Sequence, residues 1–147
     1  MDDESRGIDK RAFVRHPTEI PIEVSSTRID GPICPHLKDI SMGGISFTSK
    51  RNFQKGELIE ITIPFLTPVF HSNGVVVWSK KDGNNYEVGI RFHNLGDAFR
   101  VRMIEQVCYI EAYRKNQLEE EGRVLSSEEA AFEWIERFAE SFPRADE

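Results

Sequence analysis

The sequence predicts a mainly β fold, a six- to seven-stranded antiparallel β-barrel followed by two C-terminal α-helices. Between residues 20 and 92, short apolar segments with a two-residue period are separated by turns rich in Gly, Pro, Asp and Asn. The turn at residues 82–85, Asp-Gly-Asn-Asn, is a strong hairpin signal. After Gly96 the apolar residues recur every three or four positions, the period of a helix. Several short strands at this spacing favour a barrel or sandwich, because closure hides strand edges.

The predicted strands cover residues 20–25, 36–40, 45–49, 58–65, 69–80 and 86–92. In the first strand, Ile20, Ile22 and Val24 alternate with other residues, as expected when one face is buried. Pro21 in this segment favours an edge position, because proline has no N–H to donate to a neighbouring strand. Pro64 and Pro68 separate the fourth strand from the Val-rich fifth.

Two helices are predicted after the strands. Asp97 can cap the first, which runs to about residue 121 and ends at Gly122; its apolar positions are Val101, Ile104, Val107, Cys108 and Leu118. The second begins at the capping-box pattern of residues 126–129, Ser-Ser-Glu-Glu, and stops before Pro143. Its apolar stripe is Ala130, Ala131, Trp134, Ile135 and Phe138. These side chains must be buried, either against the barrel or first helix, or against a partner such as a second copy.

Length and composition predict one soluble domain. The chain has 147 residues, of which 39% are hydrophobic and 30% charged, and its mean hydropathy is -0.46. No apolar run is long enough for a membrane span, and the first residues do not resemble a signal peptide. We therefore expect a cytoplasmic protein. Cys34 and Cys108 are too few for a disulfide framework, which fits a reducing compartment.

The negative charge is concentrated in the C-terminal part. Residues 111–147 contain 11 acidic and 5 basic residues, which accounts for the whole net charge of -6. An acidic chain without a basic stripe argues against nonspecific nucleic-acid binding, which needs many contacts from Lys and Arg to phosphates. A small anionic ligand needs only a few arginines.

Two short motifs could supply such a ligand site. Arg11 and Arg15 lie four residues apart in the N-terminal arm, and each guanidinium is a planar fork that suits a phosphate or the O6/N7 edge of guanine. Residues 39–44, Asp-Ile-Ser-Met-Gly-Gly, place a carboxylate, a hydroxyl and two glycines in one turn. Either motif alone is also what a charged arm or an ordinary turn would contain.

Together the motifs resemble a known family. An R-x-x-x-R arm, then a strand, then a D-x-S-x-x-G turn about 25 residues on is similar to the ligand signature of the PilZ domain family, the bacterial receptors for cyclic di-GMP (c-di-GMP). Residues 74–78 and 86–92 look like late strands of that family. The resemblance covers about residues 9–110. It implies a flexible arm at residues 1–8, a PilZ domain with a PilZ-type β-barrel at 9–121, and a C-terminal helical extension at 122–147.

The resemblance also implies roles for individual residues. Arg11 and Arg15 would clamp guanine edges and phosphates of cyclic di-GMP, while a second set would hold a guanine from the barrel side: Asp39, Ser41, Gly43 and Gly44. A basic residue before the first arginine, here Lys10, accompanies binding of two stacked nucleotides in the family. Trp78 and Arg91 are secondary candidates for base stacking and phosphate contact; we favour a core position for Trp78 and a solvated one for Arg91.

The expected function is a receptor that passes the level of the second messenger to a protein partner. The arm would become ordered around the nucleotide and so present a new surface, and a homodimer through the C-terminal helices is one candidate assembly. No catalytic, metal-binding or cofactor-binding motif is recognisable, so we expect no enzyme, no metal and no cofactor. The alternatives are an interaction or assembly protein of a motility or pilus system, and an OB-like barrel that binds single-stranded nucleic acid.

Overall fold

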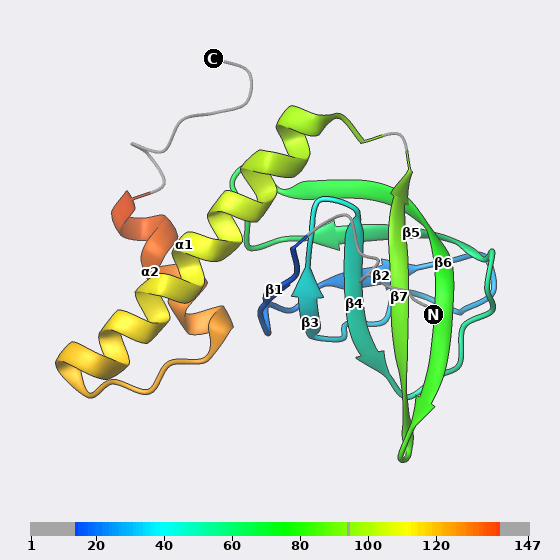
Figure 1. Ribbon diagram of the computed structural model, residues 1–147, viewed down its shortest axis with the longest axis horizontal. Coiled ribbons are helices and arrows are strands. Elements are labelled where there is room, and N and C mark those ends of the chain that lie inside the picture. Colours follow the sequence, from blue (N-terminus) through cyan, green and yellow to red (C-terminus); the bar gives the residue numbers. More distant parts are fainter. Residues whose placement is uncertain (1–13, 94, 139–147) are drawn as a thin grey trace.

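The computed structural model describes residues 14–93 and 95–138 of the chain. Seven antiparallel strands form one sheet, and two helices lie side by side next to it (Figure 1). The strands are β1 (His16–Pro17), β2 (Glu23–Ser25), β3 (Leu37–Ile40), β4 (Gly44–Ser49), β5 (Leu58–Ile63), β6 (Phe70–Asp82) and β7 (Asn85–His93). The helices are α1 (Asp97–Glu121) and α2 (Ser127–Phe138). The predicted mainly β fold with two C-terminal helices is confirmed.

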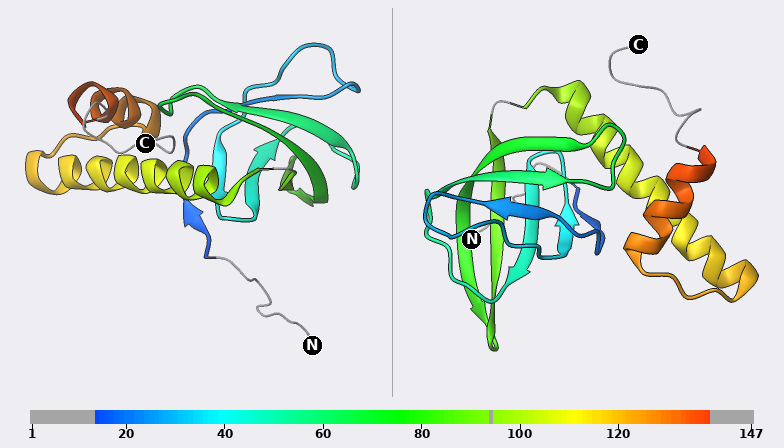
Figure 2. Two further views of the ribbon diagram at one scale, coloured as in Figure 1. Left: turned by 90° about the horizontal axis from the view of Figure 1, so that it is seen from above. Right: turned by 180° about the vertical axis from the view of Figure 1, so that it is seen from behind.

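The sheet curves strongly but stays open (Figure 2). Its strand order is β1-β3-β4-β7-β6-β5-β2, so β1 and β2 are its edges. Where the barrel would close, the chain after β1 meets the chain before β3 through the isolated bridges Pro21↔His36 and Val24↔Ile33 and through separate backbone hydrogen bonds, such as that from the Leu37 N–H to the Ile20 carbonyl at 3.0 Å. Pro35 accepts the Ile22 N–H at its carbonyl but has no N–H to return the bond, which interrupts a regular ladder there.

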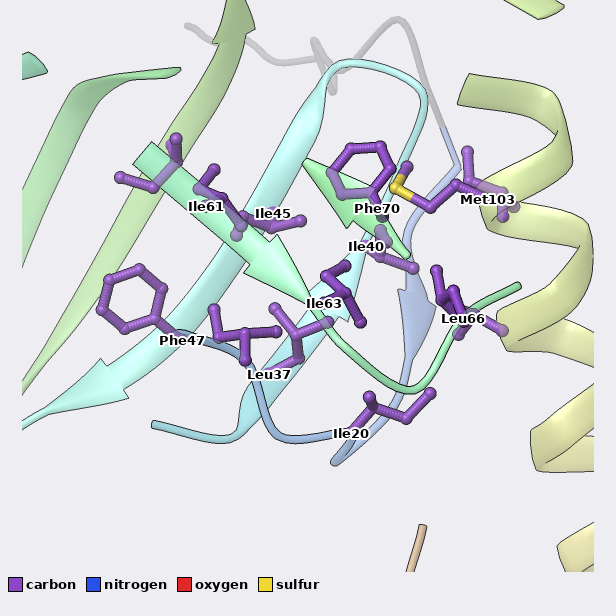
Figure 3. Packing of buried hydrophobic residues seen from close by; sticks show 14 of the residues in the cluster. Ile20, Leu37, Ile40, Ile45, Phe47, Ile61, Ile63, Leu66, Phe70 and Met103 are labelled. Carbon is purple, nitrogen blue, oxygen red and sulfur yellow. The ribbon is translucent and has the colours of Figure 1, made fainter. Parts of the chain in front are cut away.

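The core fills the inside of the curved sheet (Figure 3). Alternate residues of β5 and β7 point inward, as the two-residue period predicts, whereas Leu58 at the start of β5 is 71% exposed. Met103 of α1 lies beside Phe70 and extends the core towards the helices. Each large apolar side chain buried in this way contributes roughly 1.5 to 3 kcal/mol to stability.

The first helix has the predicted bounds, and of its predicted apolar stripe Ile104 and Val107 are buried. Gly96 is the N-cap residue and makes no side-chain cap bond; Asp97 lies in the first turn, where its charge favours the helix dipole. Gly122 ends the helix in the left-handed conformation (φ 66°) and donates its N–H to the Leu118 carbonyl. Val101 and Leu118 are exposed, because another face of the helix is buried. This face includes the polar Gln106, which accepts the Thr67 N–H at Oε1. No helix in residues 14–93 and 95–138 is long and apolar enough to cross a membrane.

The second helix packs against the first. Its predicted capping box is present: the Glu129 N–H donates to Ser126 Oγ at 3.0 Å, and the Ser126 N–H donates to Glu129 Oε1 at 2.9 Å. Trp134 stacks on Tyr109 of α1 with ring centroids 6.1 Å apart. Of the two ways to bury the apolar stripe, packing within the chain is therefore the one observed. The predicted end of this helix, before Pro143, lies outside the described residues.

The contact between the two helices should depend on acidity. Glu133 accepts hydrogen bonds from Arg123 Nη2 at 2.6 Å and from Tyr113 Oη at 2.7 Å, and these partners lower its pKa from 4.5 to about 2. A lowered pKa stabilises the fold above the unfolded value of 4.5, and this contribution is lost as the pH falls towards 2. We expect the melting temperature of the wild type to fall over this window more than that of Glu133→Gln, measured by circular dichroism. Parallel pH curves for the two proteins would contradict this.

Candidate functional site

The predicted ligand residues of β3 and of the segment before β1 lie in contact. Arg15 Nη1 is 3.4 Å from Asp39 Oδ2, and the two side chains are 33% and 16% exposed. Pairing of β1 with β3, with Pro17 opposite Asp39, brings the two together. Ser46 of β4 donates a hydrogen bond of 2.8 Å to the other carboxylate oxygen, Asp39 Oδ1. The carboxylate is therefore held at one oxygen by a buried hydroxyl and faces an arginine with the other.

Sequence reasoning missed Ser46. It lies directly opposite Asp39 in the β3–β4 ladder, and its side chain is buried. The alternation of β4 gave it an outward position, but nothing in the sequence showed which residue of β3 it would face. Ser46 positions the Asp39 carboxylate, because its bond leaves the carboxylate one preferred orientation.

The turn from Ser41 to Gly44 is held by its own groups and by its neighbours. The Ser41 N–H donates to the Gly44 carbonyl at 2.8 Å, and Ser41 Oγ accepts the Gly43 N–H at 3.2 Å. The Phe92 N–H binds the Gly43 carbonyl at 3.0 Å, which joins the turn to β7. These bonds give the turn one shape before any ligand arrives.

Gly44 has a second role that the sequence did not reveal. A Cβ at this position would overlap the backbone carbonyl of Ile90 on the neighbouring strand β7. A side chain is therefore excluded by the close approach of β4 and β7, independently of any ligand.

One row of paired residues crosses the outer face of the sheet. From β1 to β6 it runs through Pro17, Asp39, Ser46, Gly89 and Trp78. Residues directly opposite one another in a sheet point to the same face, so Trp78 shares the face of Asp39. A Cβ on Gly89 would overlap the indole of Trp78, which shows that the ring covers this glycine.

The expected core position of Trp78 is therefore wrong. Val76 points into the core, and strict alternation would send Trp78 inward too, but the ladder with β7 has an irregularity between these two residues. One extra residue in a strand turns the next side chain to the other face. Trp78 is half-buried outside the barrel, with the Lys80 ammonium 4.9 Å from its ring centroid.

The outer face is locally positive although the chain is acidic. Arg91 is exposed on β7, two residues after Gly89 and thus on the same face. Around this row, on β3, β6, β7 and the segment before β1, the cationic side chains are Arg15, Lys38, Lys80 and Arg91, and the carboxylates are Asp39, Asp82 and Glu87. An anionic ligand would find attraction here that the net charge does not suggest.

Lys10 and Arg11 lie outside the described residues, as does the arm at 1–8. A cleft of about 890 Å³ has neither Asp39 nor Ser41 in its lining, but it reaches Pro17, which lies opposite Asp39, and extends to Arg114 of α1. Among the described residues, no group of three or more His, Cys, Asp or Glu is arranged to hold a metal ion.

Comparisons with known proteins agree with this architecture. The family model described as PilZ domain matches residues 9–109. The PilZ domain with c-di-GMP of YcgR from Escherichia coli has a similar structure, with a TM-score of 0.61, 15% identity, and coverage of 76% of this chain and 98% of that chain. No curated protein sequence matches the chain significantly.

Two longer proteins share the fold. The Bacillus subtilis inhibitor of motility (MotI/DgrA) gives a TM-score of 0.56 at 18% identity, covering 77% of this chain and 53% of that one. The MrkH–c-di-GMP complex of K. pneumonia gives 0.57 at 17% identity, covering 74% and 56%. The present chain thus corresponds to about half of each.

Proposed function

The chain belongs to the PilZ domain family, and we propose that it is a receptor that binds cyclic di-GMP on the outer face of its sheet. The observation that carries this proposal is the contact of Arg15 with Asp39 beside the turn of Ser41 to Gly44. Both halves of the motif, 24 residues apart in the sequence, meet at one place. Similar structures contain c-di-GMP, which supports the same ligand here.

The two side chains suit opposite edges of one guanine. The carboxylate of Asp39 accepts hydrogen bonds from N1–H and N2–H of the base, and the Arg15 guanidinium donates to O6 and N7. Their mutual contact of 3.4 Å is long and partly exposed, so it contributes little stability and is readily exchanged for bonds to a nucleotide.

The rest of the outer face suits the second half of a cyclic dinucleotide. The indole of Trp78 offers a surface on which a base can stack, and the exposed Arg91 offers donors to a phosphate. Arg11 would complete the arginine pair from the arm, and Lys10 would favour two stacked nucleotides per chain. This ligand set is binding machinery, without a group assigned to catalysis.

The output is proposed to pass to a protein partner. Ordering of the arm around the nucleotide would create a surface that is absent without it, and the helical extension at residues 122–147 would present or stabilise that surface. A second copy of the chain, bound through the helices, is one form that this partner could take.

Calorimetric titration tests the receptor proposal. We expect the wild type to bind cyclic di-GMP with a Kd of about 1 µM or lower and to prefer it to cyclic di-AMP and GMP by about 100-fold or more. Arg15→Ala should weaken binding roughly 10- to 100-fold, because it removes charge-assisted hydrogen bonds. A ratio of two nucleotides per chain would support the role of Lys10, and a ratio of one would refute that role alone.

The control is Arg28→Ala. Arg28 is also a partly exposed arginine beside a carboxylate, 3.8 Å from Glu57, but it lies in the loop after β2, away from Asp39. It should bind like the wild type. If the folded wild type gave no binding heat and no thermal shift with cyclic di-GMP, the receptor proposal would fail in favour of the assembly protein.

A further inference from the structure

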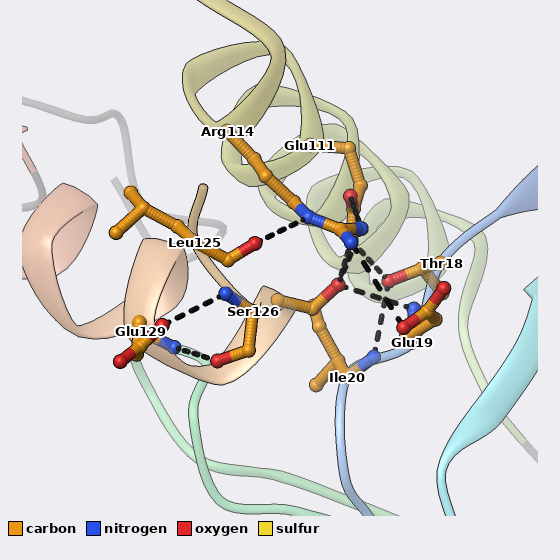
Figure 4. Close-up of polar contacts among 9 residues, drawn as sticks. Thr18, Glu19, Ile20, Glu111, Arg114, Leu125, Ser126 and Glu129 are labelled. Atoms are coloured by element: carbon orange, nitrogen blue, oxygen red, sulfur yellow. Dashed lines mark hydrogen bonds and ion pairs between the residues drawn. The ribbon is translucent and has the colours of Figure 1, made fainter. Parts of the chain in front are cut away.

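A polar cluster joins the chain that follows Arg15 to both helices (Figure 4). We call Thr18, Glu111 and Ser127 the latch. Thr18 lies just after β1, Glu111 lies in α1 and Ser127 is the first residue of α2. Thr18 and Ser127 are only 4% and 1% exposed, so their hydroxyls need partners within the protein.

The latch satisfies each of these hydroxyls. Thr18 Oγ1 and Ser127 Oγ both donate to the same oxygen, Glu111 Oε2, at 2.7 Å. Ser127 Oγ in turn accepts the Glu19 N–H at 3.3 Å, a contact between residues 108 positions apart. Short bonds to a carboxylate are the stronger kind of hydrogen bond, and linked donors and acceptors reinforce one another.

Arg114 braces the latch from the next turn of α1. Its Nη1 donates to Glu111 Oε1 and to Ser127 Oγ, each at 3.2 Å, and its Nε donates to the Leu125 carbonyl at 2.8 Å. The Leu125 bond fixes the loop between the helices. The start of α2 thus cannot move relative to Thr18 without breaking bonds to buried groups.

The latch is close to the nucleotide site along the chain. Thr18 follows Arg15 by three residues, at most about 10 Å of extended chain. Its N–H donates to the Lys38 carbonyl at 3.2 Å, one residue before Asp39. At the other end of α1, Arg100 Nη1 donates to the Met42 carbonyl of the ligand turn at 2.9 Å. Helix α1 is therefore attached to both halves of the site.

We propose that the latch couples the nucleotide site to the α1–α2 pair, so that nucleotide binding restrains α2. The inference rests on the proposed receptor function and names the element that responds. A nucleotide bound to Arg15 restricts the motion of Thr18, three residues on. Because Thr18 and Ser127 both donate to Glu111 Oε2, the motion of Ser127 is restricted as well. Coupling between two sites is reciprocal, so breaking the latch at α2 weakens the nucleotide at β1 and β3.

The test combines titration with hydrogen exchange on the full chain. Thr18→Val and Ser127→Ala should each weaken cyclic di-GMP binding by about three- to tenfold, the effect of one lost hydrogen bond. Thr18→Ser keeps the hydroxyl and should bind within about twofold of the wild type. In the wild type, saturating cyclic di-GMP should slow amide exchange in residues 127–138, and in Ser127→Ala this slowing should disappear.

Ser126→Ala is the matched control. It removes the cap bond to the Glu129 N–H and so weakens α2, but Ser126 makes no hydrogen bond to Glu111 in the described structure. If it weakened binding as much as Ser127→Ala, general loosening of α2 would explain the effect and the latch would be refuted. Unchanged exchange of α2 with nucleotide, or wild-type affinity of Thr18→Val and Ser127→Ala, would refute it equally. A wild type that binds no cyclic di-GMP would overturn the receptor proposal itself.

Discussion

Gly44→Ala is expected to lower the free energy of unfolding by about 3 kcal/mol or more, the range of severe overpacking. The added methyl group would overlap the Ile90 carbonyl, a backbone atom that cannot turn aside as a flexible side chain could. Relief requires β4 and β7 to separate, and these strands pair over the full length of β4. The change should appear in urea unfolding followed by circular dichroism, without any nucleotide present.

Gly96→Ala is the control for this result. Gly96 has an ordinary backbone conformation, and a Cβ there would meet nothing within 4 Å. Alanine is a poorer N-cap than glycine, so Gly96→Ala should lower the free energy of unfolding by about 0.5 to 1 kcal/mol, well below the loss expected for Gly44→Ala. If Gly44→Ala were as stable as the wild type and lost only nucleotide binding, the glycine would serve the approach of the ligand and not the packing of the sheet.

Asp39→Asn is expected to weaken cyclic di-GMP binding by roughly 100-fold or more, with the fold retained. Asparagine has a single carbonyl oxygen that can accept one N–H of guanine. Its NH₂ group would face the second N–H of the base, donor against donor. The lost contact with Arg15 is long and partly exposed and should cost the fold little. Calorimetric titration measures the affinity, and thermal unfolding without nucleotide verifies the fold.

Glu87→Gln is the matched control. Its carboxylate is 16% exposed, as is that of Asp39, and it pairs with Lys38 at 3.1 Å, so both substitutions neutralise an outward, ion-paired carboxylate. Affinity lost equally in the two variants would point to general electrostatics of the face. An Asp39→Asn protein that still preferred guanine to adenine would exclude Asp39 from reading the base.

Much of the fold could be predicted because its signals are local. The alternation within β5 and β7, the hairpin at residues 82–85 and the capping box at Ser126 each depend on neighbours a few residues away. The same holds for the turn from Ser41 to Gly44, whose hydrogen bonds close within four residues. Signals of this kind can be recognised in the sequence even when no contact between distant residues is known.

The candidate site was predictable in its motif residues and not in its surroundings. The positions of Arg15 and Asp39 followed from a resemblance, and the structure places them in contact. The side of the sheet that Trp78 faces depends on an irregularity of the β6–β7 ladder, which no period in the sequence marks. Val101 and Leu118 fit a helical stripe in the sequence, yet both are exposed. Which face of α1 is buried depends on its packing against the sheet and α2.

The sequence by itself determined the class of the fold, the end of α1 at Gly122, the capping box that starts α2 and the two motifs of the proposed site, because these rest on short-range geometry and residue chemistry. Only the tertiary structure decided that the sheet stays open, that Ser46 holds Asp39 and that Thr18 meets Glu111 across 93 residues. Such contacts depend on strand register and helix packing, which form only when distant segments bury their surfaces together.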